Sequence, residues 1–143
     1  MKDKIRLAKN QDTDRILELY NSSYFLWDKR SRDSEFTKKE IREYIKDKKS
    51  KMYVFEADGK IVGVLYAEFH SDYVYLNTIV VDKKYQGRGI GHILMNHLAR
   101  ESKKNKKTCI EAITERCDKP MQKIFKELNY GKGQTFIAFR RDL

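Results

Sequence analysis

The stretch "YQGRGIG" (85–91) decides how the sequence is interpreted, because three of the seven glycines of the chain fall within it. Glycine is used where the backbone takes a positive φ angle or where another molecule approaches the main chain closely. The residues before it, "YVYLNTIVV" (73–81), are mostly apolar at both the odd and the even positions, which indicates a central strand covered on both faces. After it, apolar residues recur at helical spacing from Ile90 to Leu98, and the helix is expected to run to about Lys104.

A glycine turn between a strand and a helix can bind an anion, because free backbone N–H groups and the positive end of the helix dipole converge there. A P-loop is excluded, since Gly91 is followed by His92 and not by Lys-Ser or Lys-Thr. A dinucleotide site would use Glu111 for the ribose, but Gly87, Gly89 and Gly91 give G-x-G-x-G where that fold needs G-x-G-x-x-G. A tight turn without a ligand remains the third interpretation.

Ahead of the strand at 73–81 the sequence predicts two helices and three further strands. A short strand (5–8) precedes a helix with Asp12 as its N-cap, and Thr37 and Glu40 form a capping box for a second helix. The stretch 52–70 then reads as two antiparallel strands joined by a two-residue turn at Asp58-Gly59.

Beyond the long helix the sequence predicts a strand at 108–113, a helix and a last strand at 135–141. Asp118 is expected to cap this helix, and Asn129 to end it in the left-handed conformation. With 143 residues and no internal linker, the chain is expected to form a single domain over 1–143.

The formal net charge of +10 comes mostly from lysine, as in 46–51 and 103–107, and is interpreted as solvated surface that also favours phosphates or an acidic partner. No apolar run approaches the roughly 20 residues of a membrane span, and no signal peptide opens the chain, so a cytoplasmic protein is expected. Cys109 and Cys117 are interpreted as packing residues. None of the histidines is paired at metal-ligand spacing, so packing is favoured over ligation and no metal is expected; the histidines are His70, His92 and His97.

The segment "VVDKKYQGRGIGHILMNHL" (80–98) resembles the acetyl-CoA-binding motif of the GCN5-related N-acetyltransferases, the GNAT family. Gln86, Gly89 and Gly91 fill the family's [QR]-x-x-G-x-[GA], and the expected order of strands and helices is similar to that of the family over the whole chain. The resemblance implies a GNAT-like α/β (α+β) fold. Its central mixed, mostly antiparallel sheet would be splayed between the fourth and fifth strands and carry helices on both faces.

The resemblance implies that the chain is an N-acetyltransferase that uses acetyl-CoA as co-substrate. The pyrophosphate would lie on the loop amides and the pantetheine beside the fourth strand, with Lys83 and Lys84 adding charge. The cofactor-binding residues implied in this way are Ile79, Val80, Val81, Gln86, Gly87, Arg88, Gly89, Ile90, Gly91, His92, Asp118 and Phe125.

Acetyl transfer needs a neutral amine, so a base must remove a proton from a group whose pKa is near 10.4. The resemblance favours Glu111 as the catalytic base, with Glu68 as second choice, and a backbone N–H near Val80 or Val81 as the oxyanion donor. Phe125 stands where many members carry the tyrosine that protonates the leaving thiolate. Without this tyrosine, the candidate proton donors to the thiolate are Tyr130 and Cys117.

The acceptor is expected to be a peptide or protein N-terminus, a lysine or a small amine, since the charge of +10 disfavours polycations. The family builds its acceptor pocket largely from the segment that is 21–36 here, and four aromatic residues could line it: Tyr24, Phe25, Trp27 and Phe36. The sequence is compatible with an acidic protein or a ribosomal component as partner. It is also compatible with a monomer or a homodimer. The alternative is that the protein is basic and catalytically degenerate, and that it binds acyl-CoA or associates with RNA or the ribosome.

Overall fold

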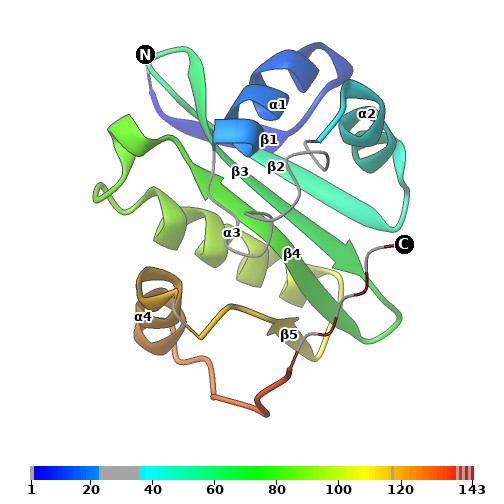
Figure 1. Cartoon of the computed structure of the whole chain (residues 1–143). Helices are drawn as coiled ribbons and strands as arrows, with labels where there is room; N and C mark the ends of the chain where they lie inside the picture. Colours follow the sequence, from blue (N-terminus) through cyan, green and yellow to red (C-terminus); the bar gives the residue numbers. More distant parts are fainter. Residues whose placement is uncertain (1, 23–35, 117, 138, 140, 142) are drawn as a thin grey trace.

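The computed structural model describes residues 2–22, 36–116, 118–137, 139, 141 and 143. Their centre is a five-stranded sheet in the order β1-β2-β3-β4-β5 (Figure 1). The strands are β1 (Lys4–Leu7), β2 (Ser50–Ala57), β3 (Lys60–Phe69), β4 (Tyr73–Val81) and β5 (Cys109–Ala112). The first four are antiparallel neighbours and β5 runs parallel to β4. The mixed, mostly antiparallel sheet is therefore confirmed.

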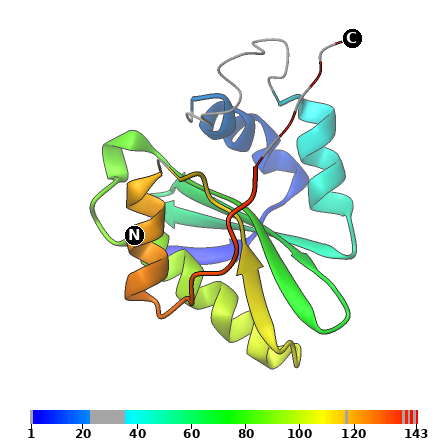
Figure 2. The same cartoon turned by 60° about the horizontal axis from the view of Figure 1, so that its bottom comes forward.

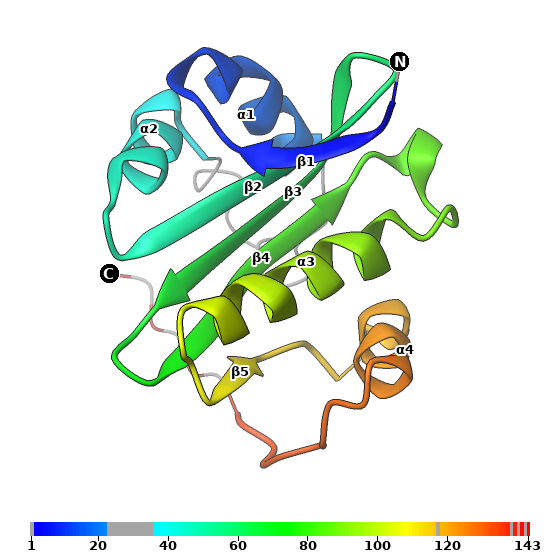
Figure 3. The ribbon, with the colours of Figure 1, turned by 180° about the vertical axis from the view of Figure 1, so that it is seen from behind.

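Helices cover both faces of the sheet, as expected. They are α1 (Thr13–Ser22), α2 (Lys38–Lys46), α3 (Ile90–Lys104) and α4 (Lys119–Glu127), with short 3-10 turns η1 (Asn10–Asp12) and η4 (Lys83–Tyr85). Figure 3 shows α3 lying across one face, with α4 beside it. Strand alternation sends Val54, Val64 and Val80 toward α1 and α2, and sends Phe55, Leu65 and Leu76 toward α3. None of the helices in the described ranges is long and apolar enough to cross a membrane.

The local signals for turns and helix ends are confirmed in most cases. Asp58 and Gly59 both have positive φ angles, 52° and 75°, as a tight hairpin turn requires. The Asp118 carboxylate accepts a hydrogen bond from the Met121 N–H at 3.1 Å and so caps α4. Asn129 follows α4 with φ 63°. The Thr37 hydroxyl accepts from the Glu40 N–H at 3.2 Å, which supplies one half of the expected capping box.

Three expectations about local structure are wrong. Asp12 is not an N-cap, because η1 runs directly into α1. Cys109 is exposed, because it alternates with residues that pack under α3 and so lies on the other face of the short strand β5. The described residues of 135–141 form no strand, and Phe136, Ile137 and Phe139 are exposed. This segment passes beside β5 (Figure 2), but β5 has only four residues with which another strand could form backbone hydrogen bonds. Cys117 lies outside the described residues.

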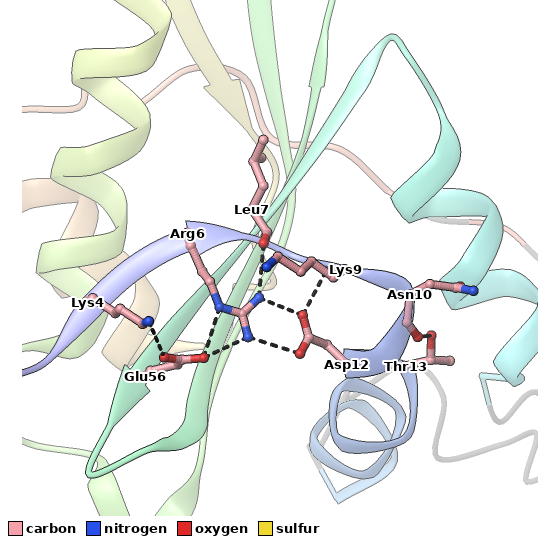
Figure 4. Close-up of polar contacts among 8 residues, drawn as sticks. All are labelled: Lys4, Arg6, Leu7, Lys9, Asn10, Asp12, Thr13 and Glu56. Atoms are coloured by element: carbon pink, nitrogen blue, oxygen red, sulfur yellow. Dashed lines mark hydrogen bonds and ion pairs between the residues drawn. The ribbon is translucent and has the colours of Figure 1, made fainter. Parts of the chain in front are cut away.

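An ion-pair network holds the first strand to the second (Figure 4). Arg6 donates to both oxygens of Asp12 at 2.7 and 3.0 Å, and through Nε and a terminal nitrogen to one oxygen of Glu56 at 2.9 and 2.7 Å. The Oδ2 atom of Asp12, which lies 2.7 Å from Arg6, also accepts from the Lys9 N–H at 2.7 Å. The Arg6 contacts hold the pKa of Glu56 below its usual value. The network therefore anchors the start of the chain to β2 and to the turn that precedes α1.

Gly63 in β3 lets α3 approach the sheet closely. A Cβ atom at this position would lie 3.1 Å from Ile90 Cγ2, 3.1 Å from Leu94 Cδ1 and 3.4 Å from Phe55 Cβ. Ile90 and Leu94 are buried residues of the first turns of α3. Glycine at this position therefore sets how near the N-terminus of α3 lies to the centre of the sheet.

We predict that Gly63→Val lowers the free energy of unfolding by about 1–3 kcal/mol, because two further methyl groups overpack this contact. The same substitution at Gly133, where a Cβ atom meets nothing within 4 Å, should change it by less than about 0.5 kcal/mol. Urea unfolding followed by circular dichroism measures both. Equal stabilities for the two variants would contradict the close approach.

Candidate active site

The open edge of β4 is the first component of the site. β5 pairs only with Tyr73 to Leu76 of β4, so the rest of β4 has no strand beside it on this side among the described residues. The register on the other side shifts at the same place: Tyr66 pairs with Thr78 and Ala67 with Leu76, which leaves Asn77 as a bulge. Bulges bend a strand and increase its twist. The splay between the fourth and fifth strands, expected from the resemblance, is therefore present.

Main-chain N–H groups of two residues face this open edge. The Asp82 N–H donates to the Val62 carbonyl at 2.8 Å, so Asp82 faces β3. Because the direction alternates along an antiparallel strand, Val80 also faces β3, whereas Ile79 and Val81 face away from it. The expectation that Val80 could supply the oxyanion donor is corrected by this alternation. Ile79 and Val81 are the residues that can donate at the edge.

The glycine loop follows the open edge and turns its backbone toward solvent. Gly87 and Gly89 have φ angles of 79° and 81°, and a Cβ atom on either would meet nothing within 4 Å. Gly89 is the N-cap residue of α3, so the adjacent N–H groups lie at the positive end of a 15-residue helix. The Gln86 side chain donates to the Val81 carbonyl at 3.0 Å and ties the loop back to the edge of β4.

Gly91 has a different role from the other two glycines. It lies in the first turn of α3, and a Cβ atom there would be 3.4 Å from Ile124 Cδ1 of α4. Close by, His92 Nε2 lies 2.6 Å from Glu127 Oε2, which joins the same two helices. The sequence analysis did not predict this contact. These contacts hold α4 against the N-terminal end of α3.

The loop carries positive charge on its outer side. The side chains of Lys83, Lys84 and Arg88 are exposed. The Arg88 guanidinium lies 4.8 Å from the ring centroid of Tyr85, which packs against the core under α3. Free amides at a helix N-terminus together with these cations form a site suited to a phosphate group.

Two carboxylates flank the start of the open edge. Glu68 in β3 and Glu111 in β5 are both in register with Tyr75 of β4, so the three side chains point to the same face of the sheet. With neighbouring strands about 4.8 Å apart, the two glutamate Cα atoms are about 10 Å apart. Glu68 is half-buried and Glu111 is exposed. Both candidate bases therefore lie at the point where β4 and β5 separate.

A scan against protein families matches residues 13–130 to the acetyltransferase (GNAT) family. The chain belongs to this family. This membership is the ground on which the acetyl-CoA interpretation of the glycine loop is proposed below.

Solved structures show the same fold. Two structures of the aminoglycoside N-acetyltransferase AAC(6')-Iy, one with CoA and one with the bisubstrate analogue CoA-S-monomethyl-acetylneamine, have TM-scores of 0.80 at 18% identity. The alignments cover 99% of this chain and 96% of that one for the CoA complex, and 100% of both for the other. The ribosomal-protein-S18-alanine N-acetyltransferase from Escherichia coli has a TM-score of 0.74 at 16% identity, over 90% of this chain and 77% of that chain.

The α4 region of this GNAT protein lies on the opposite face of the sheet from the two glutamates. Phe125 is half-buried against the core under α3, and its ring centroid lies 5.0 Å from that of Tyr130. Burial raises the pKa of the Tyr130 phenol. Phe125 thus occupies the position where the family resemblance expects a tyrosine, and the ring of Tyr130 lies directly beside it.

Aromatic residues that the sequence analysis did not single out line the glutamate face. The ring of Tyr44 stacks on that of Tyr66 with centroids 4.7 Å apart, and burial together with nearby glutamates, Glu68 among them, raises the pKa of Tyr44. The Tyr20 hydroxyl lies 2.7 Å from Thr78 Oγ1. Phe36, expected in the acceptor pocket, packs edge-on against Tyr20. Tyr24, Phe25 and Trp27 lie outside the described residues.

No three His, Cys, Asp or Glu side chains gather as metal ligands within the described ranges. His97 packs edge-on against Tyr53 at 4.7 Å, as its apolar position predicts, and burial lowers its pKa. His70 stacks on Tyr73 with ring centroids 4.6 Å apart. These two histidines therefore act in packing.

We predict that Gly89→Ala destabilises the fold by about 1–2 kcal/mol, because a non-glycine residue is strained at this positive φ angle. Gly91→Ala is the matched control. Its helical position should make alanine neutral or stabilising by up to about 1 kcal/mol. Denaturant unfolding of both variants tests the assignment, and a larger loss at Gly91 than at Gly89 would overturn it.

Proposed function

We propose that the protein is an acetyl-CoA-dependent N-acetyltransferase that moves the acetyl group to a primary amine by direct attack in a ternary complex. The observation that carries the proposal is the open edge of β4 leading directly into the glycine loop. An extended pantetheine arm can pair with such an edge as an added strand does. The pyrophosphate then reaches the loop amides at the N-terminus of α3.

The roles of the loop residues follow from their backbone geometry. Gln86, Gly87, Arg88, Gly89, Ile90, Gly91 and His92 contribute main-chain N–H groups more than side chains, since the Ile90 side chain is buried and Gly91 packs on α4. Ile79 and Val81 present N–H groups at the edge, where one of them donates to the thioester oxygen as it gains negative charge. The main chain of Val80 pairs with β3, and its side chain packs under α1 and α2. Asp118 and Phe125 support the site through α4.

In the reaction the amine nitrogen attacks the thioester carbon, and the carbon–sulfur bond of the resulting intermediate breaks. Glu111, or Glu68 as the alternative, takes the proton that the amine loses, directly or through a water molecule. The electron pair of the broken bond leaves on the sulfur. Coenzyme A is a tolerable leaving group without a donor, because its thiol has a pKa near that of cysteine, about 8.5.

The acceptor we propose is a peptide or protein N-terminus, a lysine side chain or a small amine. The face with Glu68, Tyr75 and Glu111 is locally acidic and aromatic in a chain of net charge +10. Such a face favours the approach of an ammonium group. The same proposal includes a cytoplasmic location and a single domain over 1–143. It also includes a ribosomal or acidic protein partner and a monomer or homodimer.

Acetyl-CoA binding is the direct test of the proposal. At 100 times its dissociation constant the ligand should stabilise the fold by about 2.7 kcal/mol, seen as a rise in melting temperature. Gly89→Glu should abolish the shift by placing a carboxylate at the phosphate site. An unshifted melting temperature of the parent chain at millimolar acetyl-CoA would rule the proposal out. Release of free thiol with a panel of amines then identifies the acceptor class.

We predict that Glu111→Gln lowers turnover by about 10²–10⁴-fold, because the amide cannot accept the proton. Acetyl-CoA affinity should stay nearly unchanged. Glu43→Gln, on the exposed side of α2, is the matched control and should leave the rate unaltered. Unchanged turnover in Glu111→Gln would move the base to Glu68, which Glu68→Gln then tests.

We predict that Phe125→Tyr leaves turnover unchanged or raises it, because the tyrosine adds a proton donor in nearly the same volume. Phe136→Tyr, at a side chain that is 67% exposed, is the control. In the parent protein the pH profile should rise with deprotonation and show no falling limb below about pH 10. A falling limb that disappears in Tyr130→Phe would show instead that Tyr130 supplies the proton.

The second candidate function is that of a catalytically degenerate acyl-CoA-binding or RNA-associated basic protein. The observation that favours it is Phe125, which carries no proton donor at the place where the family resemblance expects one. It predicts tight, salt-sensitive RNA binding, or acyl-CoA binding, without thiol release for any amine of the panel.

A further inference from the structure

Asp82, the residue directly after β4, uses its two carboxylate oxygens for different partners. Its Oδ1 atom accepts a hydrogen bond from the Lys84 N–H at 3.0 Å and so caps η4, the turn that leads into the glycine loop. Its Oδ2 atom accepts from Arg15 at 2.7 Å. The Tyr85 N–H donates to the Asp82 carbonyl at 2.8 Å and closes the turn. The start of the loop therefore depends on how one carboxylate is oriented.

Arg15 of α1 fixes this carboxylate from 67 residues away in the sequence. Its Nε atom donates to the Ile61 carbonyl at 2.9 Å, one terminal nitrogen donates to Glu18 at 2.9 Å, and the other donates to Asp82. Only 18% of the Arg15 side chain and 15% of the Asp82 side chain are exposed. A planar guanidinium held at three points leaves its partner little rotational freedom.

We propose that Arg15 is a positioning residue for the cofactor loop: it holds Asp82 so that Asp82 caps the Lys83–Tyr85 turn and sets the path of the amides at 86–91. This inference rests on the proposed function of that loop. The hydrogen bonds of Arg15 go to Ile61, Glu18 and Asp82 and none goes to 86–91 or to the open edge, so its effect on the loop passes through Asp82 and the neighbouring start of β3. A capping carboxylate released from Arg15 can rotate away from the Lys84 N–H.

The test compares Arg15→Gln with Arg6→Gln. Arg6 makes four hydrogen bonds to the carboxylates of Asp12 and Glu56 at 2.7–3.0 Å, where Arg15 makes two to carboxylates, and the Arg6 side chain is 22% exposed. None of these Arg6 bonds goes to Asp82 or η4, so the loss of Arg6 is a stringent control for stability alone. Small misplacements of a binding group can cost up to about 10²-fold, and we expect Arg15→Gln to weaken acetyl-CoA binding by roughly tenfold or more. The KM for acetyl-CoA should rise while kcat at saturation changes little. Arg6→Gln should leave both unchanged.

Asp82→Asn supplies a second variant, because the amide oxygen can still cap the turn while its charge for Arg15 is lost. It should weaken acetyl-CoA binding as Arg15→Gln does. The double variant should bind no more than about twofold more weakly than Asp82→Asn alone, since coupled residues are not additive. Additive losses, or an unchanged affinity in Asp82→Asn, would overturn the proposal.

Amide hydrogen exchange without ligand separates this inference from the proposed function. Arg15→Gln should speed exchange at the N–H groups of Lys84 and Tyr85, and Arg6→Gln should not. Faster exchange in Arg15→Gln, with a parent chain that does not bind acetyl-CoA, would overturn the proposed function alone. Unchanged exchange and unchanged affinity in Arg15→Gln would overturn the role of Arg15.

Discussion

The separation of β4 from β5 is the constraint on which the rest of the site depends. Backbone N–H groups are rarely left without partners, so a central strand that loses its neighbour after four residues needs a reason. In this chain the exposed groups belong to Ile79 and Val81, and the bulge at Asn77 begins where the pairing ends. The open edge is thus built into the strand register. The glycine loop and both glutamates are placed around it.

Glycine at two positions brings the helix start to this edge, each by a different physical route. Gly63 removes a side chain between β3 and the first turns of α3. Gly89 supplies a φ angle of 81° that strains other residues. Packing and backbone conformation therefore act together to aim the N–H groups of the loop at one point. The phosphate site that we propose at the loop therefore depends on backbone geometry more than on side chains.

Much of the fold could be predicted from the sequence because its signals are local. The hairpin at Asp58-Gly59, the cap at Asp118 and the long amphipathic helix each depend on residues within one or two turns. The prediction of a strand at 135–141 was wrong because strand formation depends on residues distant in the sequence. A strand needs a partner strand, and the apolar residues of 135–141 do not show whether one is available. Cys109 was misjudged because a short outer strand leaves one face uncovered.

The parts of the site that the sequence did not reveal depend on contacts across long sequence separations. Register alone brings Glu68, Tyr75 and Glu111 into one row, and it also shows that Ile79 and Val81, and not Val80, face the open edge. The ion pair between Arg15 and Asp82 joins the first helix to the end of the fourth strand. The alternation of tyrosines with buried residues in 73–81 was a usable signal for the face that carries Glu68 and Glu111, because Tyr73 and Tyr75 point away from α3.

Amide hydrogen exchange of the parent protein with and without acetyl-CoA tests the central claim most directly. If the open edge of β4 and the glycine loop form one cofactor site, the ligand should slow exchange at Ile79 and Val81 and at the loop amides of 86–91 together. Protection should not extend to the face with Glu68 and Glu111 until an amine acceptor is added. Protection of the loop without the edge, or at neither, would contradict the claim that the separation of β4 from β5 exists to receive acetyl-CoA.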